Sequence, residues 1–268
     1  RSRGLGDVYK RQIVEGALER VNPAVAKSYR DYRNYKLDFI HMMDDVYTKS
    51  QAIRYIGDKS NANTDSALVA TKRSLIFNEL NKELYRKFFM NRNELQACKD
   101  GYIYIHDQSA RLDTMNCCLF DVGSVLRGGF EMGNVWYNEP KTLDVAFDVI
   151  GDIVLSAASQ QYGGFTVPSV DLILEPYAEK SYNRALAKYE RLGIAADVAE
   201  AEALADVQKE FEQGFQGWEY KFNTVASSRG DYPFITVTAG NGTGKFAKMA
   251  TITMLDVRRK GQGKKDHK

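Results

Sequence analysis

Apolar and aromatic residues recur at helical spacing over much of the chain. Over residues 13–39 they lie three or four positions apart, and Pro23 divides this stretch into two short helices. The polar stretch GDKSNANTDS that follows is typical of a loop and a helix cap. Beyond it, the same spacing predicts helices over about residues 66–90, 141–160, 171–192 and 195–222.

Shorter stretches rich in aromatic and β-branched residues predict strands between these helices. They are GYIYIHD (residues 101–107), NCCLFDVGSVL (116–126) and YPFITVTAG (232–240). The last strand leads into the glycine-rich GNGTGK and then into another helix. Strands that alternate with long helices favour an α/β layer or an α/β barrel.

Composition is typical of a soluble globular protein. The chain has 268 residues, 44% of them apolar, and a formal net charge of +2. So small a charge gives no reason to expect nucleic acid or an anionic membrane as a partner. No apolar stretch approaches the roughly 20 residues that cross a bilayer, and the N-terminus lacks the apolar core of a signal peptide. We therefore expect a cytoplasmic protein.

Two of the three cysteines, Cys117 and Cys118, are adjacent. Neighbouring cysteines bridge poorly, so reduced thiols are expected. One interpretation of the pair is simple packing, because a free cysteine often behaves as a small buried hydrophobe. On a strand, however, adjacent side chains point to opposite faces, so one thiol could face a cavity while the other packs. No cysteine or histidine spacing matches a zinc site, and no metal is predicted within the chain.

Two other motifs have both a structural and a functional interpretation. Gly240, Gly242 and Gly244 precede Lys245, but the spacing matches neither a P-loop nor a dinucleotide-binding turn. This stretch is either a tight structural turn or a phosphate contact at a helix N-terminus. His106 and Asp107 are adjacent, and such a pair is more often a hydrogen-bonded structural unit than a catalytic base.

Several separated segments together resemble one family, the anaerobic (class III) ribonucleoside-triphosphate reductases, which are glycyl-radical enzymes that make deoxynucleotides. The resemblance runs from about Asp44 to the C-terminus. In chain order the segments are NANTD (61–65), GYIYIHD (101–107), MNCCLFD (115–121), GGFEMGN (128–134), QYGG (161–164), PYAEKSY (176–182) and PFITVTAGNGTG (233–244).

The resemblance implies the first half of a ten-stranded α/β barrel of the glycyl-radical and ribonucleotide reductase type, over residues 41–268. Residues 13–40 resemble the C-terminal remnant of an ATP-cone, the regulatory domain that precedes this barrel. Residues 1–12 resemble a translated adapter tail, which carries no fold prediction. We expect the chain to be truncated at both ends.

The same resemblance assigns a role to the cysteine pair. In the family, the cysteine after this asparagine lies on the first barrel strand and faces the substrate ribose, so Cys117 is the predicted reducing thiol and Cys118 a packing residue. A glycyl radical generates a thiyl radical on another cysteine, which takes hydrogen from C3′. The 2′-hydroxyl then leaves as water, and the first-strand thiol helps to deliver hydrogen to C2′. The predicted substrate-binding residues are Asn116, His106, Asp107, Gly163, Gly164, Gly240 and Gly242.

Cofactors and partners also follow from the resemblance. The radical glycine, the thiyl cysteine and a structural zinc site would lie beyond Lys268, so the chain alone should be inactive. Expected partners are a nucleotide substrate, ATP and deoxynucleotide effectors, formate or a thiol reductant, and a radical-SAM activating enzyme. A homodimer is expected through the barrel. Lys141, Leu143 and Phe147 are candidates for its effector-binding interface, or their helix is plain core.

Two other functions fit parts of the sequence. Another glycyl-radical enzyme, of the acyl-lyase type, would place adjacent cysteines on a finger loop, but it does not account for NANTD, YIHD and QYGG. A noncatalytic nucleotide-binding regulator would use the GNGTGK turn and the helical N-terminus. Substitution of Cys117 by Ser in a full-length enzyme separates them. A reductase would lose ribonucleotide reduction, whereas a regulator would keep its effector binding.

Overall fold

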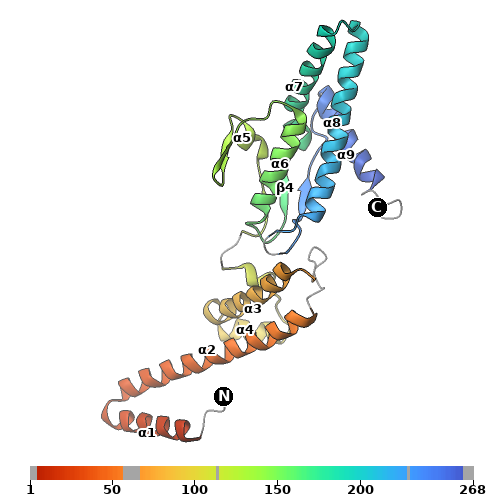
Figure 1. Cartoon of the computed structure of the whole chain (residues 1–268). Coiled ribbons are helices and arrows are strands. Elements are labelled where there is room, and N and C mark those ends of the chain that lie inside the picture. The colour runs from red at the N-terminus through yellow and green to blue at the C-terminus, as the bar shows by residue number, and fades with distance from the viewer. Residues whose placement is uncertain (1–4, 57–66, 113–114, 228–229, 262–268) are drawn as a thin grey trace. The chain divides into compact units, whose positions relative to one another are not determined.

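The chain forms two compact units, which are described separately (Figure 1). The computed structural model describes residues 5–56, 67–112, 115–227 and 230–261. The first unit comprises residues 1–57 and 75–109, and the second comprises residues 58–74 and 110–268. The NANTD segment at 61–65 lies outside the described residues.

The first unit is helical. It contains α1 (Leu5–Val21), α2 (Pro23–Ile56), most of α3 (Val69–Phe89) and α4 (Arg92–Lys99). Pro23 starts α2, and the backbone N–H groups of Ala24 and Val25 donate to Asn22 Oδ1 at 3.1 and 3.3 Å. The prediction of two short helices was therefore wrong for the second one. No glycine or proline follows Pro23 before Gly57, so nothing local ends the helix.

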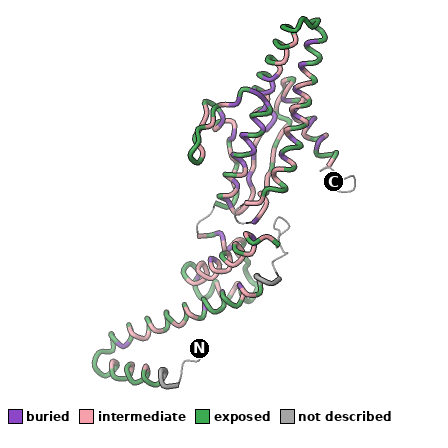
Figure 2. Tube along the Cα trace, viewed as in Figure 1, coloured by how far each residue is buried: buried purple, intermediate pink, exposed green. Residues whose placement is uncertain are grey.

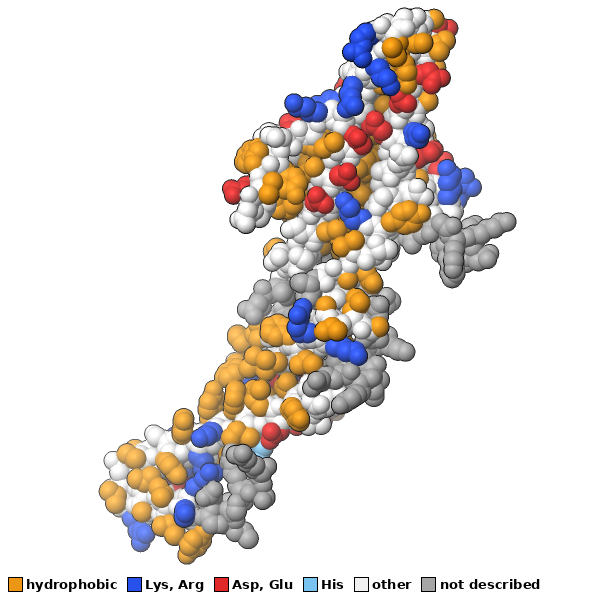
Figure 3. All heavy atoms as spheres, viewed as in Figure 1, with side chains coloured by type: hydrophobic (Ala, Val, Ile, Leu, Met, Phe, Trp, Pro, Cys, Tyr) orange, Lys and Arg blue, Asp and Glu red, His pale blue; other side chains and the backbone are white. Residues whose placement is uncertain are grey.

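The tail-like segment and the predicted domain boundary both fall inside these helices. Residues 5–12 form the first part of α1, and α2 passes through position 40 without a break. Arg30 on α2 pairs with Glu19 on α1 at 2.8 Å, which joins the two helices across their connection. Many aromatic side chains on α2 and α3 stay exposed (Figure 3); they include Tyr32, Tyr35, Phe77, Phe88 and Phe89.

The predicted strand at 101–107 is absent from the described structure. The segment is irregular chain between two turns, and both Gly101 and Asp107 have positive φ angles, of 79° and 53°. A strand needs a neighbour for its backbone groups. Here the N–H groups of Tyr102 and Ile103 donate instead to Ala97 O at the end of α4, at 2.9 and 3.4 Å. The alternating pattern therefore gave the wrong element.

The second unit contains a parallel sheet covered by helices, which confirms the α/β prediction. Within its described residues the strand order is β1 (Cys118–Leu119), β4 (Phe165–Val167) and β5 (Ile235–Val237). The helices are α5 (Val122–Leu126), α6 (Leu143–Ala158), α7 (Val170–Arg191), α8 (Ala196–Thr224) and α9 (Lys245–Lys260). The three longest predicted helices of this unit agree with α6, α7 and α8 to within a few residues. The strands are shorter than predicted.

The sequence analysis missed an antiparallel hairpin, formed by β2 (Phe130–Met132) and β3 (Val135–Tyr137). Its two-residue turn is Gly133-Asn134, with Gly133 at φ 63°. Phe130 and Tyr137 stack across the strands with ring centroids 5.1 Å apart. A Gly-Asn pair between aromatic and apolar residues is a recognised hairpin signal, so the turn could have been found.

The core lies between the sheet and the helices (Figure 2). Phe165 and Val167 of β4 are almost fully buried there. Phe147 of α6 meets Phe215 and Trp218 of α8 edge to face, and Trp218 Nε1 donates to Phe147 O at 2.8 Å. Leu143 is 0% exposed and Phe147 3% exposed inside this one chain. This burial favours the core interpretation of their apolar stripe over an effector or dimer interface.

The close approach of α6 and α8 depends on Gly214. A Cβ atom added there would overlap the ring of Phe147, whereas one added at Gly217 would meet nothing within 4 Å. We predict that Gly214→Ala lowers the free energy of unfolding by about 1–3 kcal/mol through overpacking. Gly217→Ala, three residues along the same helix, should raise it by up to about 1 kcal/mol through helix propensity. Chemical denaturation of both variants tests this, and equal effects would contradict it.

The N-terminus of α6 is held by side chains from two other helices. Leu143 N donates to Ser181 Oγ at 2.9 Å, and Ser181 Oγ donates to Glu210 Oε2 at 2.7 Å. Burial raises the pKa of the Glu210 carboxyl above its usual value, although the hydrogen bond from Ser181 opposes the shift. A raised folded-state pKa means that ionisation of this acid costs stability. The protonated Glu210 side chain therefore stabilises the fold at low pH, and this contribution is lost as pH rises through the folded-state pKa.

Replacing Glu210 by Gln removes this ionisation. We predict that the melting temperature of Glu210→Gln, relative to the parent chain, rises as pH increases from about 4 to about 7. Thermal denaturation at several pH values measures the difference. The exposed Glu200 on the same helix provides the control, since Glu200→Gln should show no such trend. A parallel trend in both variants would contradict the assignment.

Candidate functional site

Two of the motifs singled out in the sequence lie side by side at the start of the sheet. The segment before β1 runs parallel to the segment before β4, beginning at a bridge between Met115 and Gln161. Gly163 N donates to Asn116 O at 2.6 Å, and Cys118 N donates to Gly164 O at 3.1 Å. The pairing therefore continues through MNCC and QYGG into the strands themselves.

The adjacent cysteines point to opposite faces of the sheet, as their alternation predicts. Cys118 packs against the core, and its sulfur accepts a hydrogen bond from Gln161 Nε2 at 2.6 Å. Cys117 is exposed, and its Sγ accepts a hydrogen bond from Gly164 N at 3.2 Å. The Cys117 thiol also donates a hydrogen bond to Asn116 Oδ1, with the sulfur and oxygen atoms 3.7 Å apart. The outward thiol is thus held from two sides.

The face that carries Cys117 is open in this unit. Cys118, Phe165 and Ile235 are paired across the three strands, so the preceding residues, Cys117, Gly164 and Phe234, form one row on the opposite face. The next row on that face consists of Leu119, Thr166 and Thr236. Phe234 is 51% exposed and Leu119 is 77% exposed. Gly164 leaves a gap without a side chain between the thiol and the Phe234 ring.

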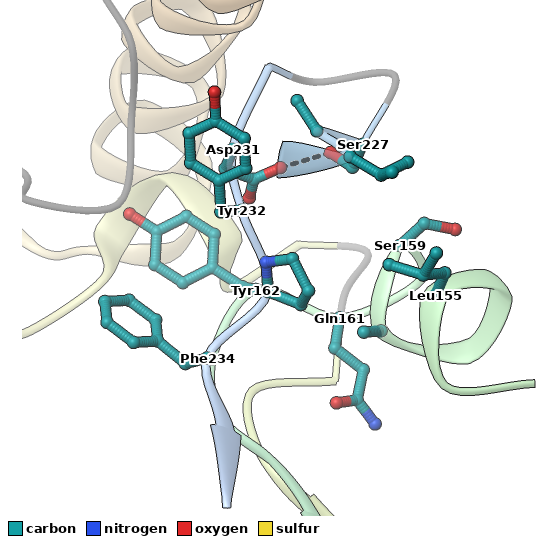
Figure 4. Close-up of a pocket in the computed structure, with 13 residues that line it drawn as sticks. Leu155, Ser159, Gln161, Tyr162, Ser227, Asp231, Tyr232 and Phe234 are labelled. Carbon is teal, nitrogen blue, oxygen red and sulfur yellow. Dashed lines mark hydrogen bonds between the residues drawn. The ribbon is translucent and has the colours of Figure 1, made fainter. Parts of the chain in front are cut away.

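A small pocket adjoins this region and shares Gly163 with it (Figure 4). It lies where α6 ends and where the chain enters β4 and β5. Figure 4 shows the rings of Tyr162, Tyr232 and Phe234 on one side of it, with Leu155 and Ser159 on the other. The volume is about 70 Å³. Pockets for drug-sized ligands measure roughly 300–1,000 Å³, so this one does not enclose a nucleotide by itself.

The glycine-rich loop after β5 is occupied by protein groups. The buried Asp171, in the first turn of α7, accepts hydrogen bonds through Oδ2 from Gly240 N at 3.0 Å and Gly242 N at 2.8 Å. The carboxylate of Glu175 lies so close to Gly244 that an added Cβ would overlap it. Two carboxylates beside the N-terminus of α9 disfavour an anion there. This favours the structural turn over phosphate contact.

The remaining predicted site residues fall elsewhere. His106 Nδ1 lies 2.5 Å from Asp107 Oδ2 in the first unit, with the His106 side chain 72% exposed. Gly240 and Gly242 follow the carboxyl end of β5, whereas Cys117 precedes the amino end of β1, so the described sheet does not bring them together. Lys141 is exposed just before α6. The sequence analysis did not single out Phe234, whose place is set only by strand register.

Among the described residues, no group of three or more His, Cys, Asp or Glu side chains is arranged to hold a metal ion. Over the same part of the chain, no helix combines the length and apolar character that a membrane span requires.

Comparison with known proteins gave consistent matches. Residues 60–268 match the family described as "Anaerobic ribonucleoside-triphosphate reductase". The protein of that name from Enterobacteria phage T4 is 35% identical over 206 residues, which are 76% of this chain and 34% of the phage protein. Its namesake from Haemophilus influenzae is 32% identical over 255 residues, which are 92% of this chain and 35% of that protein. The chain thus spans about a third of the length of these curated relatives.

A solved structure was also matched. The anaerobic ribonucleotide reductase from Thermotoga maritima, in a crystal structure with dATP and CTP, aligns with a TM-score of 0.45 and 15% identity. The alignment covers 82% of this chain and 40% of that one.

The two thiol environments predict different reactivity. Iodoacetamide should modify Cys117 at least about tenfold faster than Cys118, because thiol reactivity requires access and Cys118 packs against the core. Peptide mass spectrometry over a time course measures both rates in one sample. In urea the rates should converge. Faster modification of Cys118 in the folded chain would show that the face assignment is wrong.

Proposed function

The chain belongs to the anaerobic ribonucleoside-triphosphate reductase family, and from this premise we propose that it contributes part of the catalytic barrel of such an enzyme. The reaction would convert ribonucleoside triphosphates to deoxyribonucleoside triphosphates for DNA synthesis. The parallel β1-β4-β5 sheet would then be part of the ten-stranded barrel, with the open face of Cys117 toward its interior. Because the chain spans about a third of the length of its curated relatives, we propose this reaction for the enzyme of which it would be a part.

The single observation that supports this function is the position of Cys117. Its thiol is exposed on the open face of the sheet, held by Gly164 N–H and next to the Asn116 amide, while Cys118 packs away from that face. A reducing thiol needs this combination, because it must contact a substrate while its strand stays anchored in the core. Packing alone would not require a fixed, exposed sulfur.

The reaction assigns a specific task to this thiol. The C2′–O bond of the ribose breaks, the oxygen leaves as water and a C2′–H bond forms. Cys117 would donate the hydrogen from Sγ, and the two electrons would come from formate or a thiol reductant. A glycyl radical, installed by a radical-SAM activating enzyme, supplies the radical chemistry when present. Asn116 and the backbone of Gly163 and Gly164 would orient the sugar, in a cavity that excludes water.

Other parts of the proposal extend to regulation. Residues 13–40 would be the remnant of an ATP-cone, and ATP and deoxynucleotides would act as effectors on a cytoplasmic homodimer. Lys141, which is exposed just before α6, is the remaining candidate for a residue of the effector-binding interface. A site-shaping role for His106 and Asp107, which belong to the first unit, stays a prediction. A structural zinc site would belong to the C-terminal part of the enzyme.

The two alternative functions fit the observations less well. A nucleotide-binding regulator that used the GNGTGK turn would have to displace Asp171 from the N–H groups of Gly240 and Gly242. An acyl-lyase type of glycyl-radical enzyme would carry both cysteines on a finger loop. Here Cys118 starts a strand paired with β4, and only one thiol faces outward.

Cysteine substitutions in the full-length enzyme test the proposal. Cys117→Ser should lower kcat for ribonucleotide reduction at least about 100-fold, as expected for a group that takes part in the bond changes. The matched control is Cys118→Ser, which should retain most activity at a small cost in stability. Binding of nucleotide, measured by calorimetry, should survive in both variants. Full activity of Cys117→Ser, or selective loss in Cys118→Ser, would overturn the assignment.

A further inference from the structure

We propose that Gly163 is a positioning residue for the reducing thiol: its missing side chain creates the space in which the Cys117 sulfur and the Asn116 amide are seated. This inference rests on the proposed function and adds to the backbone role of Gly163 a second role, which acts on the reaction through Cys117. It explains why a glycine precedes β4 at this point. Three groups of the segment before β1 surround this space: Cys117 Sγ, Asn116 O and Asn116 Oδ1.

A Cβ atom at position 163 would collide with those groups. It would lie 2.7 Å from Cys117 Sγ and 2.8 Å from Asn116 O, and closer still to Asn116 Oδ1. At these distances the added carbon atom would overlap the sulfur and oxygen atoms sterically, so the thiol and the amide would have to move. The backbone oxygen cannot move freely, because it accepts the 2.6 Å hydrogen bond from Gly163 N. The side chains would therefore absorb most of the displacement.

Backbone conformation does not require a glycine here. Gly163 is not among the residues with positive φ, so an alanine could adopt its backbone angles. Space alone excludes a side chain. Glycine weakens a strand and is expected where a close approach requires it. The close approach here is to the two side chains that the proposed reaction uses.

The next residue provides a matched comparison. A Cβ atom at Gly164 would lie 3.9 Å from Cys117 Sγ and 4.0 Å from Phe234 O, which is ordinary contact. Gly164 contributes its N–H group to the thiol, and alanine would keep that group. Two adjacent glycines thus act differently on one sulfur, the first by leaving room and the second by donating a hydrogen bond.

Alkylation and NMR of the chain itself separate the two glycines. In Gly163→Ala, the iodoacetamide rate of Cys117 should change by about fivefold or more, because the sulfur leaves its seat, and the Gly164 amide signal should shift. Gly164→Ala should change the rate less than about twofold. In both variants Cys118 should stay protected. Equal effects of the two substitutions, or exposure of Cys118 together with Cys117 in Gly163→Ala, would overturn the positioning role.

A double substitution keeps the test valid if Gly163→Ala folds poorly. Asn116→Ala removes the side-chain oxygen that the new methyl group would meet, so it should relieve part of the stability loss of Gly163→Ala. A loss that is the same in both backgrounds would show that Gly163 serves only strand pairing. In the full-length enzyme, Gly163→Ala should lower kcat by about 100-fold, the scale of a 1 Å misplacement, with little change in KM.

The two proposals can fail separately. An active Cys117→Ser enzyme would refute the reductive role of the thiol, whatever position 163 does to the sulfur. An unchanged alkylation rate in Gly163→Ala would refute the seating of the thiol and would leave the role of Cys117 intact.

Discussion

The parallel pairing of the strand at MNCCLFD with the strand at QYGGFTV is the interaction on which the proposed site depends. One face of this sheet is buried against α6, α7 and α8, and Phe165 is completely inaccessible. A shift of one residue would exchange the two faces. It would bring Cys117 into the core and expose Cys118. The energy that sets the position of the thiol is therefore hydrophobic burial on the other side of the sheet.

Burial determines which face of the sheet each thiol occupies, and hydrogen bonds then fix the position of each sulfur. Gln161 Nε2 binds the inward sulfur, and Gly164 N–H binds the outward one, so each thiol of the pair has a partner from the neighbouring chain segment. A reactive group placed on a strand and held by the neighbouring strand segment is positioned more precisely than one on a loop. Asp171 holds the glycine loop after β5 in a comparable way, with one carboxylate oxygen on two N–H groups.

Helices α6 and α8, which help to cover the sheet, pack closely against each other. The aromatic contacts between Phe147, Phe215 and Trp218 need the open space at Gly214, so a single small residue determines how closely α6 and α8 pack. In the sequence, the same stripe on α6 was open to both a core and an interface interpretation. An apolar helix face shows that something covers it, and the structure shows that α8 of the same chain does.

The sequence by itself determined the elements whose signal is local. Helical periodicity located α6, α7 and α8 because each buries a continuous apolar stripe, and strand alternation placed Cys117 and Cys118 on opposite faces. Local patterns gave the wrong element in two places. Residues 101–107 alternate like a strand but pair with no strand in the described structure. Helix α2 continues beyond its predicted length because no glycine or proline follows Pro23 within it. Only the tertiary structure brought Gly163 and Gly164 to Cys117 and assigned Leu143 and Phe147 to the core. Contacts between distant segments depend on strand register and on which neighbour buries an apolar face, and neither is encoded in local spacing.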